Sequence, residues 1–341
     1  MMLRSIVKSI LIYKKKKVGI NTMNEILELA KKYSKDKHMK VLSNSDNNIL
    51  DSLYFLYDEN WENQGVSYPY EILTYLFDSY YVLPHRPDLA ALFCWQAINH
   101  SYYVQQLGMA SIRKCHDTKG IELIREALLI GNSQYKPILK PYFEKMPIKA
   151  FHYVASYLLK GYAMEMSQVA EKYRASSYKT LNKQIPILHD ILKDSYGKAY
   201  CQISNPVVVG KGVDLGIGDM YKTKSRAITH SFGEKLKKLM LGEEVEITLC
   251  DTQGTKRNYK FSEKESLSFV LFGILYASRC NNFHGNVAAR MNSIHANEDT
   301  FKLYTDIFLL EYIILAIYMN SQGEVSDMVL NRLQDNVNLM M

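Results

Sequence analysis

The chain has 341 residues, of which 47% are hydrophobic and 12% aromatic, and it includes 26 Tyr. This composition excludes a mostly disordered protein and fits either one large domain or two ordinary ones. The net charge of +7 points to a nucleic-acid partner, but residues 1–22 hold six basic and no acidic residues, so the remainder is close to neutral.

Residues 1–22 are interpreted as a basic, disordered tail, and Met23 is an alternative start of the natural chain because a helical pattern begins there. The apolar residues of the tail are interrupted by Lys8 and followed by four lysines without a small-residue cleavage site, which argues against an export signal. The five cysteines are widely spaced and form no Cys-x-x-Cys pair. This pattern favours the cytoplasm and predicts neither disulfides nor a zinc site.

Helical periodicity dominates the rest of the sequence and predicts an all-α protein. Prolines and potential capping residues mark the starts of several helices, such as Pro147 before the sixth. We expect helices over residues 24–33, 48–57, 70–80, 88–107, 118–130, 148–173, 179–196, 233–241, 263–279 and 299–320.

One segment, about 244–261, departs from the helical pattern. Val245, Ile247 and Leu249 alternate with polar residues, the chain turns through 251–254, and the alternation resumes at Tyr259 and Phe261. This pattern predicts a small β-hairpin inserted between core helices.

A glycine-rich stretch over 210–218 resembles a phosphate-binding loop but lacks the Gly-x4-Gly-Lys-Ser/Thr spacing. No amphipathic helix is expected directly after it, so a helix N-terminus for a phosphate is not predicted either. The stretch is interpreted as a flexible connector. Its neighbours Lys222, Lys224 and Arg226 are candidates for contact with an RNA backbone.

The most apolar late segment, 301–319, contains Lys302, Asp306 and Glu311. It therefore lacks the run of about 18 uncharged residues that a membrane span requires. We expect a buried core helix there and no membrane partner.

The segment 267–278 is apolar on nearly all sides, and it is followed by a polar cluster. Arg279, Asn281, Asn282 and His284 make up that cluster. Arg279 and His284 would lie roughly 140° apart on an uninterrupted helix, so either the helix ends between them or two copies of the segment meet across a dimer axis.

This set of side chains suits cleavage of RNA by its own 2′-hydroxyl group. A histidine can accept the 2′ proton or protonate the leaving 5′ oxygen, and an arginine can neutralise the phosphorane. Asn281 and Asn282 can orient the imidazole or a phosphate oxygen. The structural alternative is a helix cap at His284 and a surface charge at Arg279. The remaining histidines show no metal-ligand spacing, so neither a metal nor a cofactor is predicted.

The stretch Arg279-Cys-Asn-Asn-Phe-His284, followed by Gly285, resembles the Arg-x4-6-His signature of the HEPN superfamily, in the form found in its ApeA-like phage-defence branch. Trp95, Ala97 and Asn99 are similar to a Trp-x-Ala-x-Asn helix near the start of such domains. The two matches imply a HEPN-like helical bundle over about 85–325, with an N-terminal helical region over 23–84 and a C-terminal segment over 326–341.

The resemblance implies a metal-independent endoribonuclease that acts as a homodimer with a composite active site, in antiviral defence or as a toxin. Arg279 and His284 would be catalytic, with Asn281 and Asn282 beside them, and His100 joins Asn99 as a candidate for RNA contact. In active members Asn, Asp or His often follows the arginine, whereas Cys280 does here. The alternatives are a catalytically inactive HEPN-like module for RNA binding or dimerisation, and an unrelated helical scaffold whose motif match is accidental.

Overall fold

A computed structural model describes residues 30–41, 49–63, 67–109, 114, 116–283 and 298–340. Within these residues the chain is mostly helical and forms two antiparallel two-stranded sheets. The predicted all-α fold with a small β-hairpin insertion is therefore confirmed. The basic tail and most of the expected helix over 24–33 lie outside the described residues.

The bounds of the helices are α3 Lys35–Val41, α4 Tyr70–Val82, α5 Pro87–Gly108, α6 Asp117–Ile130, α7 Asn132–Lys145, α8 Ile148–Met166, α9 Ser176–Gln184, α10 Pro186–Asp194, α11 Tyr196–Cys201, α12 Lys222–Met240, α13 Glu263–Ser268, α14 Ala277–Phe283, α16 Glu298–Ser321 and α17 Asp327–Leu333. The strands are β1 Val207–Val209, β2 Gly212–Asp214, β3 Val245–Thr248 and β4 Lys256–Tyr259, the 3-10 turns are η1 Ile49–Asp51, η2 Glu59–Glu62, η3 Glu171–Tyr173, η4 Asp219–Tyr221 and η6 Gln334–Leu339, and η5 Phe269–Tyr276 is a π-helix. Most connections between consecutive helices from α4 to α11 are short, and the longer connections after α11 and after α12 contain the four strands.

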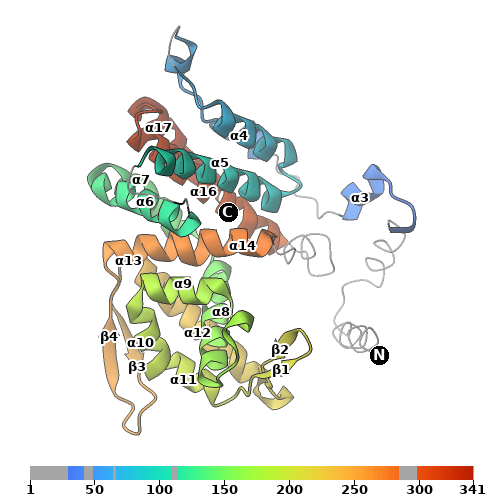
Figure 1. Cartoon of the computed structure of the whole chain (residues 1–341), viewed down its shortest axis with the longest axis vertical. Helices are drawn as coiled ribbons and strands as arrows, with labels where there is room; N and C mark the ends of the chain where they lie inside the picture. The colour runs from blue at the N-terminus through green and yellow to red at the C-terminus, as the bar shows by residue number, and fades with distance from the viewer. Residues whose placement is uncertain are drawn as a thin grey trace.

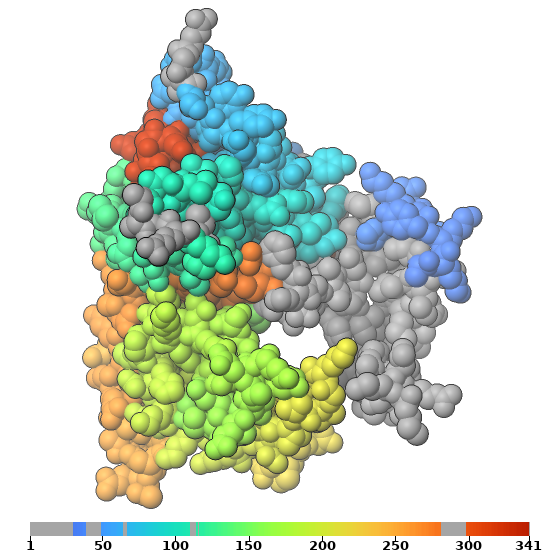
Figure 2. All heavy atoms as spheres, in the orientation of Figure 1, coloured from blue at the N-terminus to red at the C-terminus, as the bar shows by residue number. Residues whose placement is uncertain are grey.

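One long helix, made of α13, η5 and α14, crosses the middle of the molecule (Figure 1). Helices α4 to α7, α16 and α17 lie on one side of it, and α8 to α12 with both hairpins lie on the other (Figure 1). The space-filling view shows the same division, with the blue, teal and red segments at the top and the yellow-green and yellow segments at the bottom (Figure 2). Buried side chains from both sides join one core cluster. The proposed domain boundaries near residues 84 and 325 stay predictions.

Helix α16 lies in the core and packs along α5. Its residues from Tyr304 to Met319 are all buried, as the sequence predicted for this segment. No helix among the described residues is long and apolar enough to cross a membrane.

The expected helix over 48–57 is wrong. The chain makes only the turn η1 and then continues without regular secondary structure, because groups distant in sequence take its backbone hydrogen bonds. Asn336 accepts from the Tyr54 amide at 2.8 Å and donates to the Tyr54 carbonyl at 3.0 Å. The Leu56 amide donates to the Tyr312 hydroxyl at 2.5 Å. These side chains satisfy the backbone as a helix would otherwise do.

Two expected helices are shorter or divided. The helix expected over 148–173 ends at Met166, where Gln168 takes a positive φ of 54° and turns the chain. The helix expected over 179–196 is three helices, α9 to α11. Pro186 opens α10, because its ring fixes φ and it has no amide hydrogen to continue α9.

Helix α7 was not predicted, because Pro137 and Pro141 lie inside it. Helix α12 begins at Lys222, not near residue 233 as expected. Its first turns are polar and its fully buried residues begin only at Phe232, so no apolar stripe marks its start.

The predicted hairpin forms from β3 and β4, in which Val245 pairs with Tyr259 and Val245 and Ile247 are buried. The glycine-rich stretch is not a connector as expected, since β1 and β2 form a second hairpin there. Gly210 lies in its tight turn with φ of 61°, a conformation that favours glycine.

Candidate active site

The helix that carries Arg279 starts with a strong cap and passes through the core. Ser262 accepts from the Glu265 amide, and the Glu265 carboxylate accepts from the Ser262 amide, forming a capping box. Every residue of the π-helix η5 except Tyr276 is buried. The Tyr157 hydroxyl of α8 donates to the Gly273 carbonyl at 3.0 Å. Segments of π-helix often lie at functional sites, and this one directly precedes α14.

Arg279 lies on the first turns of α14 and contacts helix α6. Its Nη2 atom is 3.3 Å from Oδ2 of Asp117, the first residue of α6. Its guanidinium carbon lies 5.7 Å from the centre of the Tyr276 ring, one turn earlier on the same helix. The Arg279 side chain is 22% exposed, although its Nε atom is buried, and an anion and an aromatic ring hold the guanidinium.

The other oxygen of Asp117 accepts a hydrogen bond from Tyr102 of α5. The distance from the Tyr102 hydroxyl to Oδ1 is 3.2 Å. Burial raises the pKa of Tyr102, and the negative charge of Asp117 raises it further, so the hydroxyl keeps its proton and stays a donor. Asp117 therefore connects Arg279 of α14 with Tyr102 of α5.

Gly120 allows this arrangement. A Cβ atom at Gly120 would lie 2.0 Å from the Tyr102 ring, far inside van der Waals contact. Only glycine leaves room for the Tyr102 ring at this position of α6, one turn after Asp117. The sequence shows no pattern that marks Asp117, Tyr102 or Gly120 as part of a site.

Helix α5 presents one further predicted residue on this side. Trp95, Asn99 and Tyr102 follow at helical spacing and share one face of α5. The Trp95 and Tyr276 rings are 6.1 Å apart, and Tyr102 reaches Asp117, so this face of α5 is directed towards α14 and α6. The side chain of Asn99 is half-buried on it.

His100 belongs to another face of α5. Its ring lies 6.5 Å from the ring of Tyr75 on α4. The structure thus places Asn99 on the face of α5 that is directed towards α14 and α6, and it directs His100 towards α4.

The remaining motif residues are described only in part. Asn281 and Asn282 lie in α14, whose helical backbone continues to Phe283, and their side chains are outside what the structure describes. His284 lies outside the described residues. Cys280 is a half-buried free thiol beside Tyr276, whose pKa rises to about 12 because of burial and the nearby Cys280.

The basic residues after the glycine-rich stretch lie on the first turns of α12. Lys222 pairs with Asp219 at 2.5 Å, and Lys224 is exposed. Helix α12 packs mainly against α8 and α11. The first turns of α12 carry Lys222, Lys224 and Arg226, and their contact with RNA stays a prediction.

The structure brings His152 of α8 and His230 of α12 together, a pair that no sequence pattern predicted. Their rings stack at 4.1 Å between centres with an angle of 5°. Glu234 lies beside them, with its Oε1 atom 4.0 Å from Nε2 of His152. Among the residues that the structure describes, no group of three or more His, Cys, Asp or Glu side chains is placed to hold a metal ion.

No protein-family model matches this chain, and neither a curated protein nor a solved structure matches it. The functional interpretation therefore depends on the chemistry of the site and on the resemblance of its motif.

Proposed function

We propose that this protein is a metal-independent endoribonuclease of the HEPN type, acting in antiviral defence or as a toxin. The main support is the placement of Arg279. It follows a buried apolar helix, remains partly exposed, and is held by Asp117 and by the Tyr276 ring. A structural arginine needs only a partner, whereas a catalytic one needs a partner and access to solvent as well.

The proposed reaction is an internal transesterification of RNA. The 2′ oxygen attacks the adjacent phosphorus, the bond from phosphorus to the 5′ oxygen breaks, and the products carry a 2′,3′-cyclic phosphate and a 5′-hydroxyl. His284 accepts the 2′ proton or donates a proton to the leaving 5′ oxygen. Arg279 neutralises the charge that builds up on the phosphorane oxygens, and Asn281 and Asn282 position these groups.

Asp117 limits the freedom of the Arg279 side chain before substrate binds. A long arginine side chain loses about 2 kcal/mol of rotamer freedom when it is fixed in one position. The ion pair with Asp117 and the contact with Tyr276 account for part of this ordering in the free protein. The guanidinium is then closer to the geometry that phosphorane binding requires.

A homodimer is part of the proposal, because one copy of the motif supplies a single arginine and a single histidine. Two copies that meet at the ends of their α14 helices would combine both sets in one cleft. Solution mass measured at micromolar concentration tests this part, and a strict monomer contradicts it.

The second candidate is an inactive HEPN-like module that binds RNA or dimerises. Cys280 favours it, since this position follows the arginine and often carries Asn, Asp or His in active members of the family.

Labelled RNA incubated with the purified protein and excess chelator separates the two candidates. The nuclease proposal predicts cleavage that disappears in Arg279→Ala and in His284→Ala. A matched control is Arg257→Ala, because Arg257 is also paired with an aspartate, at 2.9 Å from Asp194. It lies on β4, near the opposite end of the long central helix from α14 (Figure 1). Intact RNA that still binds the protein supports the inactive module and contradicts the nuclease.

A further inference from the structure

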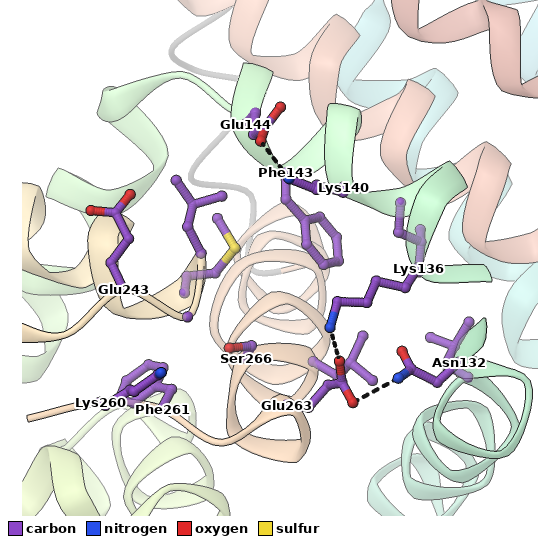
Figure 3. A pocket seen from close by; sticks show the side chains of 16 residues that line it. Asn132, Lys136, Lys140, Phe143, Glu144, Glu243, Lys260, Phe261, Glu263 and Ser266 are labelled. Atoms are coloured by element: carbon purple, nitrogen blue, oxygen red, sulfur yellow. Dashed lines mark hydrogen bonds and ion pairs between the residues drawn. The ribbon is translucent and has the colours of Figure 1, made fainter. Parts of the chain in front are cut away.

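A cavity of about 620 Å³ lies at the start of the long central helix, at the opposite end from Arg279 (Figure 3). Side chains of α7, the end of α12, the residues after β4 and the start of α13 line it. Its volume is within the range of about 300–1,000 Å³ that small-molecule sites occupy. Nothing in the proposed nuclease chemistry uses this cavity.

The floor of the cavity is apolar. Leu139 and Phe143 come from α7, Met240 from the end of α12, and Phe261 and Leu267 from the two sides of the Ser262 cap. Figure 3 shows the Phe143 ring directed from α7 towards the start of α13. Such a floor is suited to an aliphatic or aromatic group.

The rim is charged, and most of its charges are paired. Lys136 contacts Glu263 at 2.5 Å, and the Asn132 amide donates to the other oxygen of Glu263 at 2.8 Å (Figure 3). Lys140 pairs with Glu144 at 3.7 Å. Together with Lys260 and Glu243 the rim carries three lysines and three glutamates. A balanced rim disfavours a multiply charged anion such as a polyphosphate.

Three polar groups of the cavity have no partner among the residues that the structure describes. Ser266 is 8% exposed, and its hydroxyl takes part in no hydrogen bond there. Lys260 and Glu243 are exposed on the rim and form no ion pair with each other or with other described residues. The turn at Gly242, with φ of 78°, and the hydrogen bond from the Glu243 amide to the Lys238 carbonyl at 3.0 Å fix the backbone that carries Glu243.

These groups define a ligand by complementarity. A carboxylate suits the Lys260 amine, and an amine suits the Glu243 carboxylate. In a dipeptide, the peptide group between these two charges suits the Ser266 hydroxyl. We propose that this cavity binds a small zwitterion with an apolar body, the chemistry of an apolar amino acid or dipeptide. The volume leaves room for either, and both carry the same pair of opposite charges.

Titration calorimetry with the full chain tests the proposal. The probes are L-phenylalanine, the dipeptide L-phenylalanyl-L-phenylalanine, and this dipeptide with either its amine acetylated or its carboxylate amidated. We expect the zwitterionic forms to bind, and each blocked form to bind at least about tenfold more weakly. The comparison of phenylalanine with the dipeptide shows which of the two ligand classes the cavity prefers. Equal binding of blocked and zwitterionic dipeptide, or no binding of any probe, overturns the proposal.

Single substitutions test which residue binds the carboxylate of the ligand and which binds its amine. Lys260→Ala should weaken binding of the zwitterionic dipeptide, so that it binds no more tightly than the amidated form. The zwitterionic dipeptide should still bind more tightly than the acetylated form. Glu243→Gln should remove the difference in affinity between the zwitterionic and the acetylated dipeptide and leave the difference from the amidated form. Ser266→Ala should weaken the binding of all dipeptide probes to the same extent. Lys211→Ala, an exposed lysine in the β1–β2 turn, is the matched control and should bind like the wild type. An unchanged pattern in the Lys260 and Glu243 variants contradicts the proposed orientation and overturns the assignment of the site.

Discussion

Replacing Asp117 with alanine removes a carboxylate that contacts two side chains. The Tyr102 hydroxyl would lose its acceptor while the ring stays buried, at 1% exposed, and a buried donor without a partner costs about 1–3 kcal/mol. The pair with Arg279 is partly exposed, with side-chain exposures of 22% and 33%, so it contributes at most about 1 kcal/mol. We expect Asp117→Ala to lower the free energy of unfolding by about 2–3 kcal/mol.

A double-mutant cycle separates the two contacts. Urea unfolding followed by circular dichroism gives the free energy of unfolding of Asp117→Ala, Tyr102→Phe, Arg279→Ala and the two double variants. In Tyr102→Phe the hydroxyl is absent, so a further Asp117→Ala change should cost about 1 kcal/mol less than it does in the wild type. The coupling between Asp117 and Arg279 should be smaller and should fall with added salt.

The effects of two substitutions on the free energy of unfolding add within about 0.3–0.5 kcal/mol when the two sites are independent. If the Asp117 and Tyr102 changes add within that limit, the two side chains do not interact, and the argument that Asp117 joins α5, α6 and α14 is refuted. If the Asp117 and Arg279 coupling increases with salt, the contact is not an ion pair.

The remaining predictions concern packing and pH. Gly120→Ala should lower the free energy of unfolding by about 1–3 kcal/mol, because its Cβ would lie 2.0 Å from the Tyr102 ring. An unchanged free energy of unfolding contradicts this close packing. Burial raises the pKa of Glu311 well above 4.5, so the unfolded chain releases a proton that the folded chain keeps, and the stability of the wild type should fall as the pH rises above about 4.5. Urea unfolding at about pH 5 and pH 8 measures this loss of stability, which should be smaller in Glu311→Gln than in the wild type. An equal loss in both proteins contradicts a neutral, buried Glu311. Burial and then the charge of His230 lower the pKa of His152 below 6.5, so the unfolded chain binds more protons and stability should fall as the pH drops below about 6.5. His152→Phe keeps an aromatic ring in the stack and should reduce this acid sensitivity, and an unchanged pH profile refutes the assignment to His152.

The helices and strands that were predicted correctly are those that form from the pattern of apolar residues within their own segment. Helices α4, α5 and α6 follow the apolar periodicity closely, and the alternation of Val245 and Ile247 with polar residues identifies β3. The fully apolar run before Arg279 was sufficient to predict a core helix with a polar end, although not that eight of its residues form a π-helix.

The elements that were missed depend on contacts between distant residues. The extended segment after η1 takes its hydrogen bonds from Asn336 and Tyr312, which no local pattern reveals. The same limit applies to the candidate site. Arg279 was found from the end of an apolar helix, whereas Asp117 and Tyr102 join it only through the packing of α5 and α6 against the long central helix.

The chemical nature of the cleavage products tests the central claim most directly. The wild-type protein is incubated with a single-stranded RNA in excess chelator, and the fragments are weighed by mass spectrometry, beside the same RNA with 2′-O-methyl groups throughout. The proposal predicts fragments with a 2′,3′-cyclic phosphate and a 5′-hydroxyl from the unmodified RNA, and no fragments from the methylated RNA or with Arg279→Ala. Cleavage of the methylated RNA, fragments with a 5′-phosphate, or intact RNA throughout would contradict it.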